Sequence, residues 1–155
     1  MRVLVADDVP EVAALVAHVV RLVRTGRIEV TVELDGRRAV ERVSHTSFDL
    51  VVTDCRMRGA DGVEVLSAAR RLHPAGRRVL MTGYDEVPVA FDRLRDACVD
   101  AYLHKPLRAQ DLLLLVSGLL REDPLVVEHA RIAARDLEFA AIRESRADPV
   151  LRLVG

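Results

Sequence analysis

Several protein classes are excluded by what this sequence lacks. No run of 18 apolar residues could span a bilayer, and the N-terminus, MRVLVADD, meets acidic residues too early for a secretory signal. No basic stretch suggests nucleic-acid binding, and the formal net charge is −1. There are only two cysteines, Cys55 and Cys98, and they are more simply interpreted as free thiols in a reducing compartment than as a disulfide. These absences predict a cytoplasmic protein that binds neither membranes nor nucleic acid.

Lysine is nearly absent as well. The chain contains 22 arginines and a single lysine, Lys105. A compact ammonium and a planar guanidinium are not interchangeable in their contacts. Position 105 therefore either requires an ammonium group or keeps one by chance.

Apolar patterning predicts five strands alternating with five helices. We expect strands over residues 2–6, 28–34, 48–53, 78–82 and 100–104, and helices over residues 12–24, 37–45, 62–72, 88–97 and 108–120. Short unalternating runs such as FDLVV indicate strands buried on both faces, as in a parallel sheet. Short connections between alternating strands and helices predict an α/β fold with a doubly wound, five-stranded parallel sheet.

Finer features of these elements follow from the same patterns. Residues 28–34 alternate strictly, which predicts a half-buried edge strand with Ile28, Val30, Val32 and Leu34 on its buried side. The first helix is expected to bury Leu15, Val19, Leu22 and Val23. The Arg77-Arg78 pair is most simply a solvated strand end.

Four of the five expected strands end at ionisable or hydroxyl side chains that could bind a ligand or take part in a reaction: Asp7-Asp8, Asp54, Thr82 and Lys105. The carboxyl ends of neighbouring parallel strands lie at one edge of a sheet, where such folds bind ligands. Three carboxylates together call for a cation unless one is protonated, and an all-oxygen site suits Mg²⁺. Lysine and threonine beside them favour phosphoryl chemistry, with a carboxylate attacking a neutralised phosphoryl group.

This ordered set, together with Tyr102 and the dipeptide Lys105-Pro106, resembles the receiver domain of bacterial two-component response regulators over about residues 1–120. The resemblance implies a flavodoxin-like strand order of 2-1-3-4-5. It also implies that Asp54 accepts a phosphoryl group from a histidine kinase or phosphotransfer protein.

The same resemblance assigns the remaining roles. Asp7, Asp8, Asp54 and the backbone carbonyl of Arg56 would hold Mg²⁺. Lys105 would pair with the phosphoryl oxygens. As the switch, Thr82 would swing toward the phosphoryl group and Tyr102 would turn inward with it.

Three positions depart from the family pattern. Met57 is followed by Arg58, where the family usually has proline. Arg56 stands two residues past the acceptor, and Tyr84 stands two residues past Thr82. In this family the latter two positions tune the lifetime of the phosphoryl group. A bulky pair there predicts slow self-dephosphorylation.

Beyond a receiver domain at residues 1–121, residues 122–155 are expected to form a helical extension. The helix over 108–120 is apolar nearly all round, so its outer face should be covered. A helix over 124–146 carries two apolar stripes, so it either folds back onto the domain or pairs two chains as a homodimer. The segment is too short for a DNA-binding output domain, and its acids at least match its arginines. We therefore expect signalling to an unknown downstream protein.

Three functions compete. The first is a phosphorylation-driven switch, not an enzyme beyond its own phosphorylation and dephosphorylation. The second is a pseudo-receiver scaffold that is never phosphorylated, favoured by Arg56 and Arg58. The third is a Mg²⁺-dependent phosphatase with an aspartyl intermediate, which needs a second acid beside its nucleophile; Cys55 and Arg56 cannot supply one.

Overall fold

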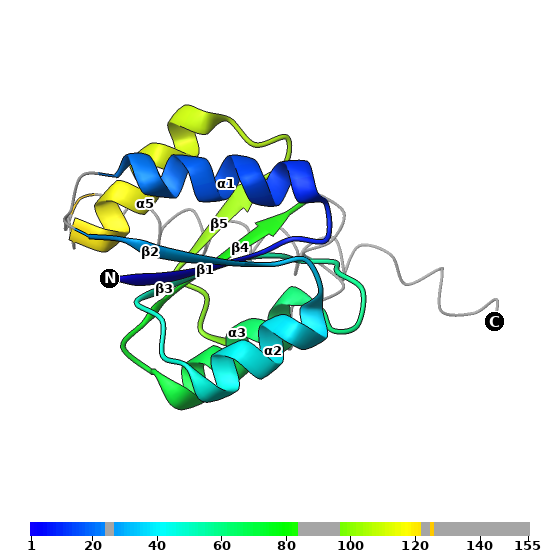
Figure 1. Cartoon of the computed structure of the whole chain (residues 1–155). Coiled ribbons are helices and arrows are strands. Elements are labelled where there is room, and N and C mark those ends of the chain that lie inside the picture. The colour runs from blue at the N-terminus through cyan, green and yellow to red at the C-terminus, as the bar shows by residue number, and fades with distance from the viewer. Residues whose placement is uncertain (24–26, 84–96, 122–124, 126–155) are drawn as a thin grey trace, which may run out of the picture.

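The computed structural model describes residues 1–23, 27–83, 97–121 and 125 (Figure 1). Its single described sheet contains five strands: β1 (Arg2–Ala6), β2 (Glu29–Glu33), β3 (Leu50–Asp54), β4 (Arg77–Thr82) and β5 (Ala101–His104). All neighbouring pairs are parallel, and the strand order is β2-β1-β3-β4-β5. The predicted doubly wound parallel sheet and its order are confirmed.

Helices cover both faces of this sheet. Helix α1 (Pro10–Leu22) and helix α5 (Ala109–Arg121) lie on one face, and helices α2 (Gly36–His45) and α3 (Gly62–Leu72) lie on the other (Figure 1). The helix expected over 88–97 falls almost entirely outside the described residues, as does the one expected over 124–146. No helix within the described ranges is long and apolar enough to cross a membrane.

The core consists of two apolar layers separated by the sheet. In β1, Val3 and Val5 pack into the layer beneath α1 and α5, while Leu4 and Ala6 pack into the layer beneath α2 and α3. All four side chains are fully buried. Burial on both faces explains why this strand reads as an unbroken apolar run.

Local capping fixes where the helices begin, close to the carboxyl edge of the sheet. Pro10 occupies the first turn of α1, where its missing N–H costs nothing. The Asp35 carboxylate accepts a hydrogen bond from the Arg38 N–H at 3.1 Å and caps α2. Asp61 and Glu64 form a capping box at the start of α3, with reciprocal bonds of 2.9 and 3.0 Å.

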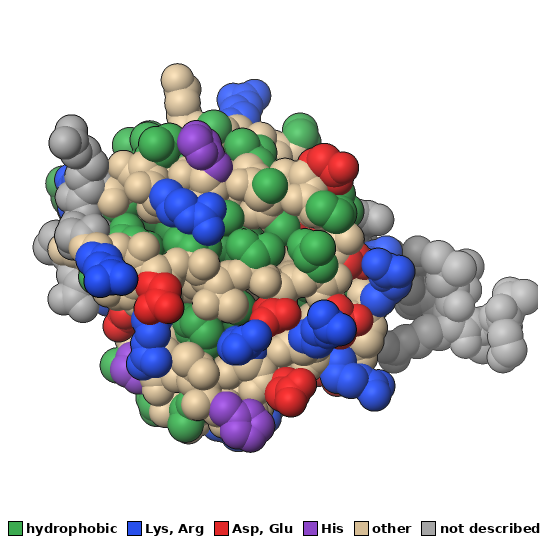
Figure 2. Space-filling view, viewed as in Figure 1, with side chains coloured by type: hydrophobic (Ala, Val, Ile, Leu, Met, Phe, Trp, Pro, Cys, Tyr) green, Lys and Arg blue, Asp and Glu red, His purple; other side chains and the backbone are tan. Residues whose placement is uncertain are grey.

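Two predicted apolar faces are partly wrong. In α1, Leu15 and Leu22 are exposed, because the helix instead buries a stripe of smaller residues that includes Ala13, Val16, Ala17 and Val20. In the edge strand β2, Val30 packs against the core, whereas Val32 and the following Leu34 are exposed. Figure 2 shows the resulting apolar side chains gathered over α1 and β2. On α5, Leu114 is 68% exposed, and the segment expected to cover this face lies outside the described residues.

Arg78 is not the solvated strand end that the sequence suggests. It is only 7% exposed at the start of β4. Its guanidinium donates to the carbonyls of Cys98 (2.8 Å) and Pro74 (3.2 Å) and lies 3.5 Å from the Asp100 carboxylate. A buried charge requires such partners, and a sequence pattern does not reveal partners as distant in the chain as Cys98 and Asp100.

Candidate functional site

The predicted site residues lie at the carboxyl edge of the sheet. Asp7 and Asp8 directly follow β1, Asp54 is the last residue of β3, Thr82 is the last residue of β4, and Lys105 directly follows β5. Because β1, β3, β4 and β5 are successive neighbours in the sheet, their ends converge.

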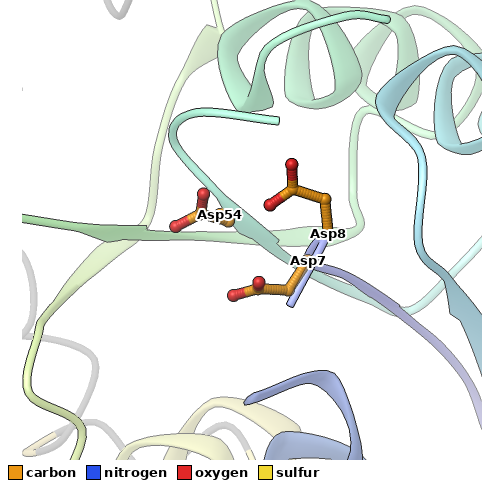
Figure 3. Close-up of side chains that lie close together, drawn as sticks. All are labelled: Asp7, Asp8 and Asp54. Carbon is orange, nitrogen blue, oxygen red and sulfur yellow. The ribbon is translucent and has the colours of Figure 1, made fainter. Parts of the chain in front are cut away.

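The three aspartates form an acidic cluster. One carboxylate oxygen from each of Asp7, Asp8 and Asp54 lies within 4.8 Å of the other two, and the three side chains lie close together (Figure 3). An octahedral Mg²⁺ with ligands at about 2.1 Å holds its oxygens about 3 to 4.2 Å apart. The spacing and the all-oxygen donor set therefore fit a magnesium ion after small movements.

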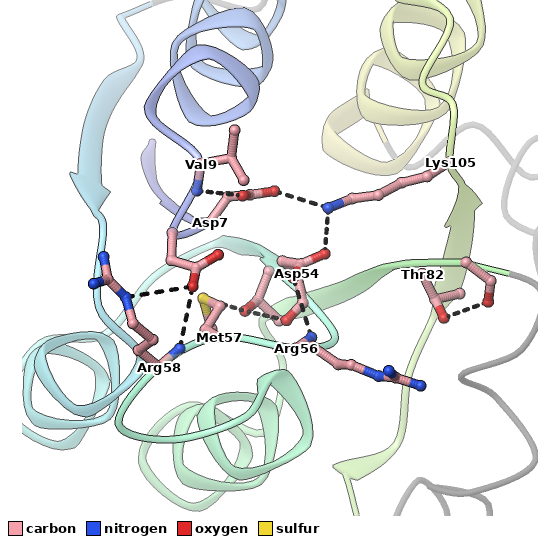
Figure 4. A network of polar contacts seen from close by, with 11 residues as sticks. Asp7, Val9, Asp54, Arg56, Met57, Arg58, Thr82 and Lys105 are labelled. Atoms are coloured by element: carbon pink, nitrogen blue, oxygen red, sulfur yellow. Dashed lines mark hydrogen bonds and ion pairs between the residues drawn. The ribbon is translucent and has the colours of Figure 1, made fainter.

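Lys105 joins this cluster from β5. Its Nζ lies 2.5 Å from Asp54 Oδ1 and 3.2 Å from Asp7 Oδ2 (Figure 4). The one lysine of the chain thus bridges two buried carboxylates. A compact ammonium with three donors suits two acceptors in different directions.

Burial and this lysine shift the pKa of Asp54 in opposite directions. Burial raises the pKa of Asp54 above its ordinary 3.8 and the charge of Asp7 adds to the rise, although Lys105 and the Arg56 N–H oppose it. For Lys105, burial acts to lower the pKa, but Asp54 and Asp7 outweigh it, so the pKa lies above 10.5. Asp54 is therefore a more basic carboxylate than an exposed one, facing an ammonium that stays charged.

Backbone N–H groups orient all three carboxylates. Asp7 Oδ1 accepts from the Val9 N–H at 2.9 Å, and Asp54 Oδ2 accepts from the Arg56 N–H at 3.1 Å. Asp8 Oδ2 accepts from the Arg58 N–H at 3.3 Å (Figure 4). Asp54 and Asp8 are thus held by N–H groups of the loop between β3 and α3.

Thr82 and Tyr102 are not members of the cluster, and Tyr102 is paired with Leu80, two residues before the end of β5. The fully buried Thr82 hydroxyl donates to the Gly83 carbonyl at 2.9 Å. Tyr102 is half-buried on β5 and packs against the layer beneath α2 and α3. Arg56 contributes its backbone to the site, and its side chain is exposed. Tyr84 lies outside the described residues.

Two features of the site were missed by sequence reasoning. The Arg58 guanidinium lies beside Asp8, with Nε 3.7 Å from Oδ2. Gly62 packs so closely on the backbone of Asp54 that a Cβ there would lie 2.1 Å from the Asp54 carbonyl oxygen. The departure from proline at position 58 was the only signal of the first, and nothing in the sequence signalled the second.

Comparison with known proteins gives consistent results. Residues 3–117 match the family model described as "response regulator receiver domain". The transcriptional regulatory protein ZraR of Escherichia coli K12 is 36% identical over 108 residues, which cover 70% of this chain and 23% of ZraR. The transcriptional regulatory protein TcrA of Mycobacterium tuberculosis H37Rv is 33% identical over 157 residues, which cover 99% of this chain and 59% of TcrA.

Solved structures agree with these relatives. The CheY-like receiver domain protein of Methanospirillum hungatei JF-1 superimposes with a TM-score of 0.67 at 25% identity, covering 78% of this chain and 94% of that one. The chain spans less than two thirds of ZraR and of TcrA. Its fold and its match over residues 3–117 place it in one family: the chain belongs to the response regulator receiver domains of two-component systems.

Proposed function

We propose that this protein accepts a phosphoryl group on Asp54 from a histidine kinase or phosphotransfer protein and passes the signal on through protein–protein contacts. The observation that carries the proposal is the contact of Lys105 Nζ with both Asp54 and Asp7, inside a cluster of three converging carboxylates. Lysine is otherwise absent from the chain, so its presence at this position supports a chemical role.

In the proposed reaction an Asp54 carboxylate oxygen attacks the phosphorus of the donor phosphohistidine. The new O–P bond forms as the P–N bond breaks, and the leaving imidazole nitrogen takes a proton from solvent. Lys105 neutralises the phosphoryl oxygens, and burial makes the Asp54 carboxylate more basic. Asp7, Asp8, Asp54 and the Arg56 carbonyl would hold Mg²⁺, which when bound supplies further positive charge to those oxygens.

Thr82 and Tyr102 form the proposed switch. The Thr82 hydroxyl, now bonded to the neighbouring Gly83 carbonyl, would turn to the new phosphoryl oxygens. The space that it leaves on the α2–α3 side of the sheet would let the half-buried Tyr102 ring turn inward. A local change of charge would thereby bias a surface between two states.

For the output we propose a receiver domain at residues 1–121 and a helical extension at 122–155 that docks on the domain or pairs two chains. The alignment with TcrA covers 99% of this chain, so its similarity reaches into this extension. ZraR and TcrA are named transcriptional regulators and are longer than this chain.

One observation favours a second function. Arg58 places a cation beside Asp8, which an unphosphorylated pseudo-receiver could use in place of a metal ion. Such a scaffold would act through binding alone.

Intact mass spectrometry distinguishes the two functions. The protein is incubated with Mg²⁺ and acetyl phosphate, beside samples with excess chelator and beside an Asp54→Asn variant. We expect one phosphoryl group on the native chain with Mg²⁺ only, and its slow loss on dilution would support protection by Arg56 and Tyr84. No mass gain with any divalent metal would refute the switch and support the scaffold.

A further inference from the structure

Arg58 lies in the loop after β3 and contacts the most exposed aspartate of the cluster. Its N–H donates to Asp8 Oδ2 at 3.3 Å, and its guanidinium Nε lies 3.7 Å from the same oxygen (Figure 4). The Asp8 side chain is 23% exposed, whereas those of Asp7 and Asp54 are almost fully buried. Asp8 is therefore the carboxylate that an entering cation meets from solvent.

The backbone of Arg58 is held in place on two sides. Its carbonyl accepts a hydrogen bond from the Gly36 N–H at 2.9 Å, at the start of α2. Gly59 follows with φ of +86°, a left-handed conformation that favours glycine. The loop thus delivers the Arg58 side chain beside Asp8.

We propose that the Arg58 guanidinium competes with Mg²⁺ for Asp8 and sets the metal affinity of the site. This inference rests on the proposed function, since it assumes that the acidic cluster binds the metal. Lys105 already bridges Asp7 and Asp54, so with Arg58 on Asp8 each carboxylate has a cationic neighbour. An entering Mg²⁺ must displace this guanidinium or tolerate a like charge beside it.

The expected effect is modest because the Arg58 side chain is 82% exposed. An exposed ion pair of this kind contributes little, so its removal should tighten metal binding by about two- to fivefold at low salt. At 1 M salt the electrostatic screening length falls to about 3 Å, so the difference in metal affinity between native chain and variant should nearly disappear. The result would be a receiver whose phosphorylation needs more Mg²⁺ than its carboxylates alone require.

Direct metal binding tests the inference without phosphorylation. Free Mn²⁺ is counted by electron paramagnetic resonance during titration of the full chain, and Mg²⁺ affinity follows from competition. Arg58→Gln removes the charge and keeps the N–H to Asp8, whereas Arg58→Lys keeps the charge. Arg21→Gln is the matched control, because it removes one exposed arginine at the end of α1 opposite the site.

We expect Arg58→Gln to bind Mg²⁺ about two- to fivefold more tightly, with Arg58→Lys and Arg21→Gln within twofold of the native chain. Equal affinity of Arg58→Gln and the native chain at low salt would overturn the inference and leave the proposed function intact. Weaker binding by Arg58→Gln would also overturn it, because Arg58 would then organise the site. No binding by any of these proteins would refute the metal-dependent switch itself, and the inference with it.

Discussion

Gly62 allows a test of how the fold positions Asp54, the proposed phosphoryl acceptor. It is the first residue of α3, and its N–H donates to the Cys55 carbonyl at 3.0 Å. A Cβ at this position would lie 2.1 Å from the Asp54 carbonyl oxygen and 2.9 Å from a methyl group of Leu80. The helix therefore begins directly against the residue that we propose is phosphorylated.

The size of the effect follows from this distance. The Asp54 carbonyl and a new Cβ must separate by about 0.9 Å to reach even a 3.0 Å contact, and the first atom to be moved is backbone. Overpacking of this kind costs about 1 to 3 kcal/mol, more than alanine returns through helix propensity. A displacement of about 1 Å at a reacting group also slows reaction by up to about 100-fold. Gly62→Ala should therefore lose both stability and phosphorylation rate.

Gly76→Ala is the matched control. Its Cβ would lie 2.5 Å from the Phe48 carbonyl oxygen, before β3 and away from the acceptor at the other end of that strand. Urea denaturation gives the stability of each variant, and the rate of mass gain with acetyl phosphate gives the activity of the folded protein. We expect both variants to lose stability but only Gly62→Ala to react slowly. If Gly62→Ala were destabilised yet reacted at the native rate, the proposed coupling of helix position to the acceptor would be wrong.

Three further predictions concern buried charge. Asp54→Asn should be more stable to urea than the native chain in metal-free buffer at pH 7, by about 1 kcal/mol, because burial raises the pKa of Asp54 and the fold favours a neutral side chain. The native chain loses stability as pH rises above 3.8, because the buried carboxyl group becomes charged. The difference in stability between the two proteins should therefore vanish below pH 3.8. Lys105→Met should cost about 1 to 2 kcal/mol at pH 7. Since the pKa of Lys105 lies above 10.5, its stabilisation is complete below 10.5 and is lost as pH rises through the folded value, where native and variant urea midpoints should converge. Arg78→Met should cost about 3 kcal/mol and Arg77→Met clearly less, because Arg78 is the more buried and satisfies two carbonyls.

The fold was predictable because its signal is local and repeated. Strands buried on both faces leave unbroken apolar runs, and capping residues such as Asp35 and Asp61 stand where the helices begin. The face of α1 was harder to predict. Two of its alanines and three of its valines form the buried stripe, while the larger Leu15 and Leu22 face solvent, so size was a poor guide to burial. In β2 the limit is position, because an edge strand is only partly covered by its neighbours.

The acidic cluster was predictable for a different reason. Asp7 and Asp54 end apolar strands, and the parallel sheet carries strand ends to one edge, so order along the chain translates into proximity. Arg58 and Arg78 have no such rule. Each contacts a residue about 20 or more positions away in the chain. The loop after β3 brings Arg58 to its partner, and the start of β4 brings Arg78 to its partner. Periodicity says nothing about these contacts, and their partners became visible only with coordinates.

The separation of apolar layers from charged edge also explains how the site tolerates its own electrostatics. The layers above and below the sheet contain the large fully buried side chains, among them Leu4, Leu66 and Leu112. The carboxylates lie where these layers end, oriented by backbone N–H groups and neutralised from β5 by Lys105. Burial raises the pKa of Asp54 and so disfavours its charged form, yet it also makes that carboxylate more basic and thereby a stronger nucleophile toward phosphorus. Stability supplied by the layers thus offsets an unfavourable arrangement of charges at the edge. Arg58 adds a cation beside Asp8 there, and in the proposed function Mg²⁺ would compete with it for that carboxylate.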